Sequence, residues 1–163
     1  GMEMKNSYGS SVLKGLILVA VVAFLLGWIF SEGATFYDAI EENWGIVLPK
    51  GEEVYSCTTP SDFHGDGDRY YVIGYHAHTD LSQVAAWEER VDERALEALQ
   101  SIWRYDDFAP EETYLPQDIS MPYRYFQKNK NGNGDQLVMI YAQDAQLGGR
   151  TYAQVIFVAE RHS

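Results

Sequence analysis

The chain has 163 residues, of which 12 are basic and 24 are acidic, so its formal net charge is −12 at neutral pH. This charge repels polyanions, which argues against a nucleic-acid partner and disfavours anionic lipid headgroups, but it permits cationic partners and divalent metal ions. Cys57 is the single cysteine, so the chain cannot close an internal disulfide.

The stretch Val12–Phe30 holds no charged side chain after Lys14. A helix rises 1.5 Å per residue, so this stretch would extend about 28 Å, close to the roughly 30 Å of a bilayer core. A helix that is apolar all round, without a polar stripe, is typical of a membrane segment. The sequence therefore predicts a transmembrane helix over Val12–Phe30, with the lipid bilayer as its partner.

The charges that flank this stretch predict its orientation. Lys5 and Lys14 lie at its N-terminal side, whereas acidic residues follow it closely. Because positive charge stays in the cytoplasm, we expect a single-pass protein of the cell membrane with its C-terminal domain outside the cytoplasm. The alternative is a signal peptide cleaved near Ser31 or Gly33, but the flanks favour an uncleaved signal-anchor. The expected parts are a cytoplasmic N-terminus (1–11), a transmembrane signal-anchor (12–30), a juxtamembrane segment (31–52) and an extracytoplasmic domain (53–163).

Alternating and turn-rich patterns predict a short helix and five strands after the apolar stretch. The helix is expected over Glu32–Asn43. The expected strands are Glu53–Thr58, Arg69–His78, Tyr123–Gln127, Gln136–Ala142 and Tyr152–Glu160. Two Asn-Gly pairs within Lys128–Asp135 are a strong hairpin signal. Both faces of Gln136–Ala142 are apolar, so we expect this strand at the centre of the sheet.

A long helix is expected from Asp80, which can cap it together with Gln83, to about Trp103. At 100° per residue its apolar side chains fall on one side. They are Val84, Trp87, Val91, Ala95, Ala98, Leu99 and Ile102. The stripe predicts that Trp87 and Val91 face the sheet.

Together these elements predict an α+β fold. It consists of one N-terminal transmembrane helix and a two-layer domain, in which an antiparallel sheet of about five strands packs against one long helix. The order β-β-α-β-β-β is cystatin-like, and this analogy concerns topology only.

The loop before the second strand is the most unusual part of the sequence. Its candidate binding residues are Asp62, His64, Asp66 and Asp68. The first three, with Gly67, fall on the first, third, fifth and sixth positions of an EF-hand calcium loop. The twelfth position is Ile73, where the pattern needs a bidentate Glu. The favoured alternative is a Gly-rich turn whose Asp side chains accept backbone N–H bonds.

His76 and His78 are two residues apart on the expected strand, so their imidazoles face one side, and Asp80 follows. Such a pair can share one zinc or copper ion, with loop acids completing the ligand shell. The alternative is a pair of half-exposed histidines at the end of a strand. We predict no cofactor other than a divalent metal at this cluster.

Cys57 is a candidate thiol nucleophile, with His64 or His76 as its general base. A lone cysteine in an alternating strand is more often a small core residue. The sequence contains no P-loop, dinucleotide fingerprint, G-x-S-x-G or H-E-x-x-H motif. We therefore predict no catalytic residue.

Three short segments carry a resemblance. They are Ile46–Gly51, with its Leu-Pro pair, Val54–Ser56, and Phe63–Gly67, which reads F-H-G-D-G before a strand. They resemble small uncharacterised membrane-anchored proteins of Gram-positive bacteria that have a similar juxtamembrane Leu-Pro segment and F-H-G-D-G loop. Tyr123–Phe126 is similar more loosely, and the chain departs from the group at Glu160–Ser163. The resemblance spans residues 46–160 and implies architecture and a bacterial envelope location, without a mechanism.

Two hypotheses about function follow. The first is a membrane-anchored, extracytoplasmic, non-catalytic domain that binds another protein or a cell-envelope component, as immunity proteins and envelope sensors do. The second is a metal-dependent hydrolase that uses the His/Asp cluster of residues 62–80. The first is favoured, because the sequence has an acidic domain and an expected anchor but no catalytic constellation.

Overall fold

The structure is a computed structural model that describes residues 11–24, 36–59, 67–103, 109–117, 119–130, 132 and 134–162. The chain divides into two compact units, residues 1–45 and 46–163. The second unit contains the sheet.

The first unit contains a helix over residues 11–24 and the helix α2 (Phe36–Trp44). The first of these helices extends about 21 Å at 1.5 Å per residue. In the described part of the chain no helix is long and apolar enough to cross a membrane. The predicted transmembrane signal-anchor over Val12–Phe30 is therefore wrong, and so is the single-pass membrane localisation. The described helix ends at Phe24, and residues 25–30 lie outside the described part.

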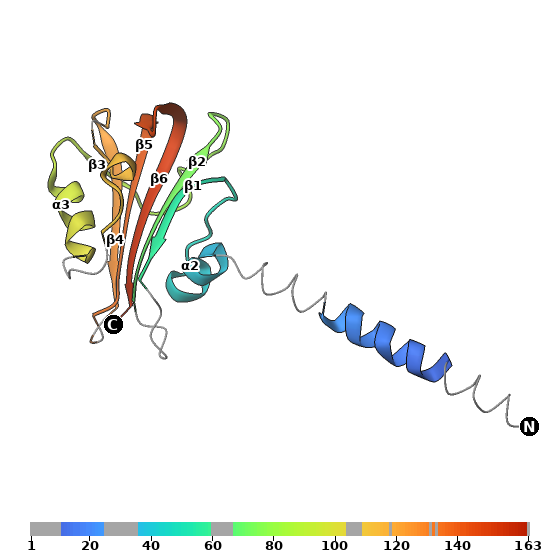
Figure 1. The fold of residues 1–163 in the computed structure, drawn as a ribbon. Helices are drawn as coiled ribbons and strands as arrows, with labels where there is room; N and C mark the ends of the chain where they lie inside the picture. The colour runs from blue at the N-terminus through green and yellow to red at the C-terminus, as the bar shows by residue number, and fades with distance from the viewer. Residues whose placement is uncertain are drawn as a thin grey trace, which may run out of the picture. The chain divides into compact units, whose positions relative to one another are not determined.

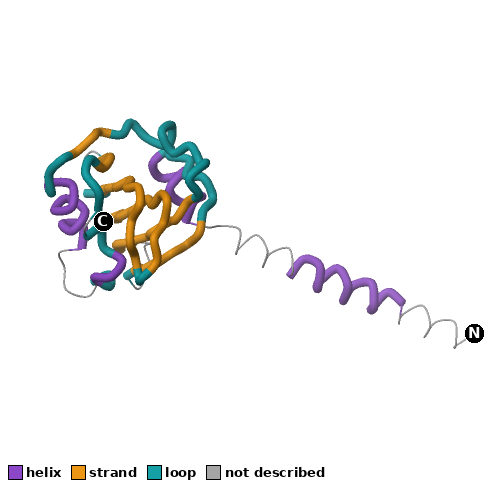
Figure 2. The backbone as a smooth tube through the Cα atoms, turned by 90° about the horizontal axis from the view of Figure 1, so that it is seen from above, coloured by secondary structure: helices purple, strands orange, loops and turns teal. Residues whose placement is uncertain are grey.

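The second unit is a six-stranded antiparallel sheet with short helices (Figures 1 and 2). Its strands are β1 (Glu52–Thr58), β2 (Gly67–Tyr75), β3 (Glu88–Arg90), β4 (Tyr123–Asn129), β5 (Gln136–Leu147) and β6 (Arg150–His162). Its helices are α3 (Arg94–Gln100), η1 (Ser101–Trp103) and η2 (Glu112–Tyr114). The strand order is β1-β2-β6-β5-β4-β3, so β6 and β5 lie at the centre.

The core on one face of the sheet explains why α3 packs there. Leu99 and Ile102, from α3 and η1, are fully buried in one cluster with Val72, Ile140 and Phe157 of the three central strands. Burying a side chain of this size is worth about 2 kcal/mol. Alternation along β2, β5 and β6 supplies these residues at every second position. Figure 1 shows α3 beside the sheet.

The predicted fold class is wrong, chiefly because the long helix does not exist. Residues 80–87 form turns, Glu88–Arg90 pairs with β4 as a strand, and only Arg94–Gln100 is α-helical. The sheet has six strands, and the order is β-β-β-α-β-β-β before any 3-10 helices are counted. Pairing with an existing sheet edge therefore overrides a helical period in the sequence.

The apolar stripe of the expected helix is distributed between two environments. Trp87 packs against Tyr141 on the sheet, with ring centroids 5.6 Å apart, and its indole N–H donates to the Leu81 carbonyl at 2.8 Å. Val91, in contrast, is 76% exposed, so the prediction that it faces the sheet is wrong. Asp80 closes a turn by accepting the backbone N–H of Ser82 at 3.0 Å, and residues 81–87 form no helix.

The five predicted strands are all present, with different ends. β5 extends to Leu147, and β6 already begins at Arg150. Gly148 and Gly149 form the turn between the two strands, with positive φ angles of 58° and 78°. The predicted strand Arg69–His78 ends at Tyr75, so His76 and His78 lie in a turn. β5 lies between β6 and β4, as the apolar pattern of Gln136–Ala142 predicts.

Candidate functional site

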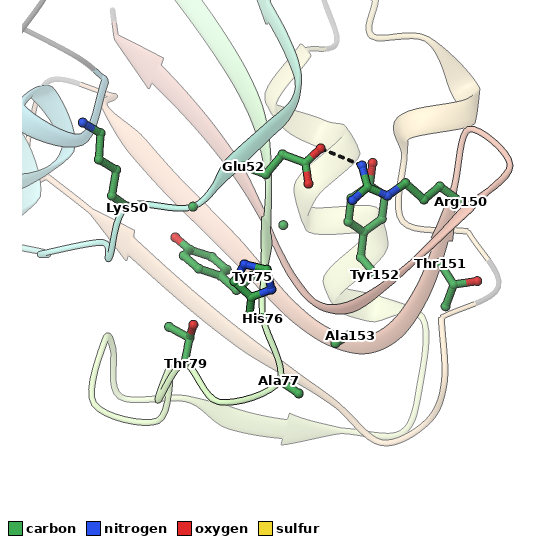
Figure 3. A pocket seen from close by; sticks show the side chains of 12 residues that line it. Lys50, Glu52, Tyr75, His76, Ala77, Thr79, Arg150, Thr151, Tyr152 and Ala153 are labelled. Carbon is green, nitrogen blue, oxygen red and sulfur yellow. Dashed lines mark hydrogen bonds and ion pairs between the residues drawn. The ribbon is translucent and has the colours of Figure 1, made fainter.

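A pocket of about 360 Å³ lies at the end of the sheet where β2 finishes and β6 begins (Figure 3). Three segments of the second unit form it: residues 50–52, 74–79 and 150–153. We call this region the pocket end. The residues that line the pocket are Lys50, Gly51, Glu52, Gly74, Tyr75, His76, Ala77, Thr79, Arg150, Thr151, Tyr152 and Ala153.

Two glycines let the backbones that form the pocket approach closely. A Cβ atom at Gly51 would lie 2.6 Å from the carbonyl oxygen of Gly74. A Cβ atom at Gly74 would lie 2.8 Å from the Tyr152 ring. Real Cβ atoms do not approach other heavy atoms this closely, so a larger side chain at either position requires a shift of the surrounding chain. The floor of the pocket is therefore specific to glycine.

The charged side chains of the pocket end are exposed, and cations outnumber anions. Arg150 Nη1 donates to the Glu52 carboxylate at 2.7 Å, and the guanidinium lies over the Tyr152 ring at 4.8 Å. The hydrogen bond to Glu52 raises the pKa of Arg150 above its ordinary value. Figure 3 shows that Lys50 extends away from Arg150, with the His76 ring between them. Two permanent cations thus flank this pocket in a chain that is strongly acidic elsewhere.

The rim of the pocket is fixed by hydrogen bonds from beneath. The buried amide of Gln154 donates from Nε2 to the carbonyls of His76 and Thr79, at 2.8 Å each. Its oxygen accepts the hydroxyl of Tyr141. On the other side, the Tyr75 hydroxyl donates to the Pro49 carbonyl at 2.7 Å. These bonds hold the backbone of the turn 76–79 in place, while the His76 side chain stays exposed.

The structure describes three of the predicted site residues, Asp68, His76 and His78, and it does not bring Asp68 together with the two histidines. Asp62, His64 and Asp66 lie outside the described residues, and His76 and His78 are exposed in the turn after β2.

Asp68 lies near the other end of β2. Asp68 and His76 are eight positions apart in the chain, or about 26 Å when extended, which is too far for both to bind one metal ion. No group of three His, Cys, Asp or Glu among the described residues could hold a metal. Binding of a divalent metal by this chain stays a prediction.

Cys57 is half-buried on β1, opposite Tyr70, and packs against the core cluster. Tyr70 and His76 are six positions apart in the chain, which corresponds to about 20 Å when extended. Cys57 and His76 therefore do not form a nucleophile and base. His64, the other base considered, lies outside the described residues.

A second charged region, which the sequence analysis missed, lies at the opposite end of the sheet. We call it the charged end; it comprises Asp68, Arg69, Asp135, Glu160, Arg161 and His162. The Glu160 side chain has no exposed area, and its carboxylate lies 3.7 Å from Arg69 Nη1 and contacts the His162 ring. His162 Nδ1 lies 3.7 Å from the Asp135 carboxylate.

The pair Asp68–Arg161 completes the charged end, with 3.5 Å between the carboxylate and Nε. Burial raises the pKa of the Asp68 carboxyl, although the Arg161 guanidinium opposes this effect. The backbone N–H of Asp68 donates to the Thr59 hydroxyl at 2.9 Å. The side chain of Asp68 therefore belongs to the framework of the sheet.

The sequence offered a weak signal for the pocket cations. Lys50 precedes Gly51, and Arg150 follows the pair Gly148-Gly149, so each cation stands beside glycines at the start of a strand. Nothing in the sequence indicated that these two turns meet, because the meeting depends on the strand order.

Comparisons with known proteins found no matching family, no similar curated protein and no similar solved structure. The resemblance to membrane-anchored Gram-positive proteins therefore stays a prediction. Its most specific part, the F-H-G-D-G loop, falls mainly on residues outside the described chain.

Proposed function

We propose that residues 46–163 form a non-catalytic binding domain, and that the pocket end holds an acidic group of the partner. The observation that carries this proposal is the pocket itself, in which Lys50, His76 and Arg150 come from three segments to surround a floor of closely packed glycines. A volume of about 360 Å³ is at the small end of the range for ligand sites, which suits one side chain or one chain terminus.

The chemistry of the cations supports an acidic partner group. A guanidinium has five N–H donors, and only one Arg150 donor atom is engaged by Glu52 in the described contacts. The remaining donors can hold a carboxylate by charge-assisted bonds, which are stronger than neutral ones. Lys50 also lines the pocket and adds a second positive charge, and its side chain extends away from Arg150. The acidic remainder of the chain keeps polyanions away, so a small isolated anionic group is favoured.

The His76 side chain is exposed beside the pocket, so it can contact a bound partner group directly. No group of three metal-binding side chains among the described residues favours the metal-dependent hydrolase.

The test is a titration of the ¹⁵N-labelled protein with N-acetylglycine, followed by amide chemical shifts. We expect shifts confined to residues 50–52, 74–79 and 150–153, and a loss of affinity of about tenfold in Arg150→Gln. The matched control is Arg94→Gln, because Arg94 also forms an exposed ion pair, with Asp92 at 3.7 Å, but lies outside the pocket. Equal binding by both variants, or shifts elsewhere, would reject the proposal.

A further inference from the structure

We infer that the acidic group is the C-terminal carboxylate of an extended polypeptide, which pairs with the outer edge of β1 as an additional strand. This inference rests on the proposed function, because it assigns an occupant to the same pocket. Three features of β1 support it: its position in the sheet, the direction of its chain and the charges beside it.

β1 is the longer of the two edge strands. It stands at one end of the strand order, and β2 is the only described strand that pairs with it. It has seven residues, whereas β3 at the other edge has three. An edge strand presents backbone N–H and C=O groups on its outer side, and another chain can pair with them. β1 therefore offers the longer backbone template.

The direction of β1 determines which end of an added strand reaches the pocket. β1 begins beside the pocket, at Glu52, and runs away from it to Thr58. A strand that pairs antiparallel, as every strand of this sheet does, runs back towards the pocket and ends there with its carboxyl terminus. A parallel strand would instead bring its N-terminal ammonium group to Lys50, which electrostatic repulsion disfavours.

The charges along this route fit a carboxyl terminus. Lys50 is exposed and precedes β1, and in Figure 3 its side chain extends away from Arg150. The carboxylate of an arriving strand can therefore lie beside Lys50, at the edge of the pocket. Glu53 is exposed beside a β-bulge, and Glu52 is already paired with Arg150. Glu53 thus favours a basic side chain about three residues before the terminus of the added strand.

The experiment is a selection from a library of random octapeptides displayed with free C-termini, using the full chain as bait. The enriched peptide is then synthesised as the free acid, as the C-terminal amide and as the N-acetyl derivative of its last residue alone. We expect the amide and the single residue to bind at least about tenfold more weakly than the free acid. We also expect slower amide hydrogen exchange in residues 55–58 when the free acid binds.

Variants separate the parts of the inference. Lys50→Ala should lower the affinity for the free-acid peptide and leave the affinity for the amide peptide unchanged. Glu53→Lys should reverse the preference for a basic residue in the selected peptides, whereas Glu88→Lys, an exposed glutamate of the other edge strand, should not. A selection that enriches no peptide, or peptides that bind without protecting residues 55–58, would overturn the inference.

Failure of the inference is distinguishable from failure of the proposed function. If N-acetylglycine and the single residue bind as well as the octapeptide, the pocket takes an acidic group but β1 accepts no strand. If the acid and the amide bind equally well and N-acetylglycine does not bind, both proposals are wrong.

Discussion

The two ends of the β2–β6 strand pair use charge in opposite ways. At the charged end, Glu160 is fully buried and lies against Arg69 and His162, on neighbouring strand positions. At the pocket end, Arg150 and Glu52 form an ion pair whose side chains are about half exposed or more. A buried carboxylate must be compensated within the protein, whereas exposed charges remain available to a partner. The charged end therefore compensates its buried carboxylate within the fold, whereas the exposed charges of the pocket end support the proposed binding role.

The largest expected effect is on the charged end. Arg69→Met should leave the buried Glu160 carboxylate without its guanidinium and lower the free energy of unfolding by about 3 kcal/mol. Urea unfolding measures this. Arg94→Met is the control, since its exposed ion pair with Asp92 should contribute less than about 1 kcal/mol. Similar losses in both variants would mean that burial at Glu160 does not distinguish the two ends.

The close packing of Gly51 against the backbone of β2 at the pocket end predicts the second largest effect. Gly51→Ala places a methyl group 2.6 Å from the Gly74 carbonyl oxygen and should destabilise the fold by about 2 kcal/mol. It should also abolish N-acetylglycine binding, because the floor must move. Gly15→Ala meets no atom within 4 Å and serves as the control in both measurements. Unchanged stability and affinity in Gly51→Ala would contradict the packing argument.

The support beneath the rim gives a smaller effect. Gln154→Leu removes two hydrogen bonds to the turn 76–79 and leaves the Tyr141 hydroxyl without its acceptor, so we expect a loss of about 1–2 kcal/mol. Amide hydrogen exchange at residues 76–79 should also become faster. Gln146→Leu, on the exposed side of β5, should change neither property. If exchange in the turn stays slow, other contacts fix the rim.

The smallest effect is a pH dependence at Asp68. Because burial raises the pKa of this carboxyl in the folded state, its stabilising contribution is full below its unfolded pKa and is lost as pH rises through the folded value. The stability of Asp68→Asn relative to wild type should therefore increase from about pH 3 to pH 7. Urea midpoints across this range measure it, with the exposed Asp144→Asn as control. If the stability of Asp68→Asn relative to wild type instead increases as the pH falls, the pKa of Asp68 is lowered on folding and the prediction is wrong.

The strands of the sheet were predictable, because alternation is local. Val138 and Ile140 face one side of β5 and Met139 the other, and the register with β6 follows from the hairpin turn. The conformation of residues 80–103 was not predictable in the same way. Glu88–Arg90 has no local strand pattern and becomes a strand because β4 supplies a partner for its backbone.

The candidate site was less predictable than the fold. The sequence analysis selected His76 and His78 for their spacing, but that spacing has meaning only on a strand, and β2 ends one residue earlier. Lys50 and Arg150 are distant in the sequence and line one pocket only because β1, β2 and β6 are neighbours. Glu160 belongs to a mostly apolar segment, and only the structure shows that Arg69 lies opposite it.

The long β5–β6 hairpin has a consequence for the order of folding. Its strands are adjacent in the chain and joined by Gly148 and Gly149, so closing the hairpin requires only a short loop. β2 joins the same strand by long-range pairs such as Gly67 with His162, which close a much larger loop. We therefore expect the hairpin to form early and β2 to dock on it later, with β1 following. The pocket would then be completed among the last parts of the domain, because it needs all of β1, β2 and β6.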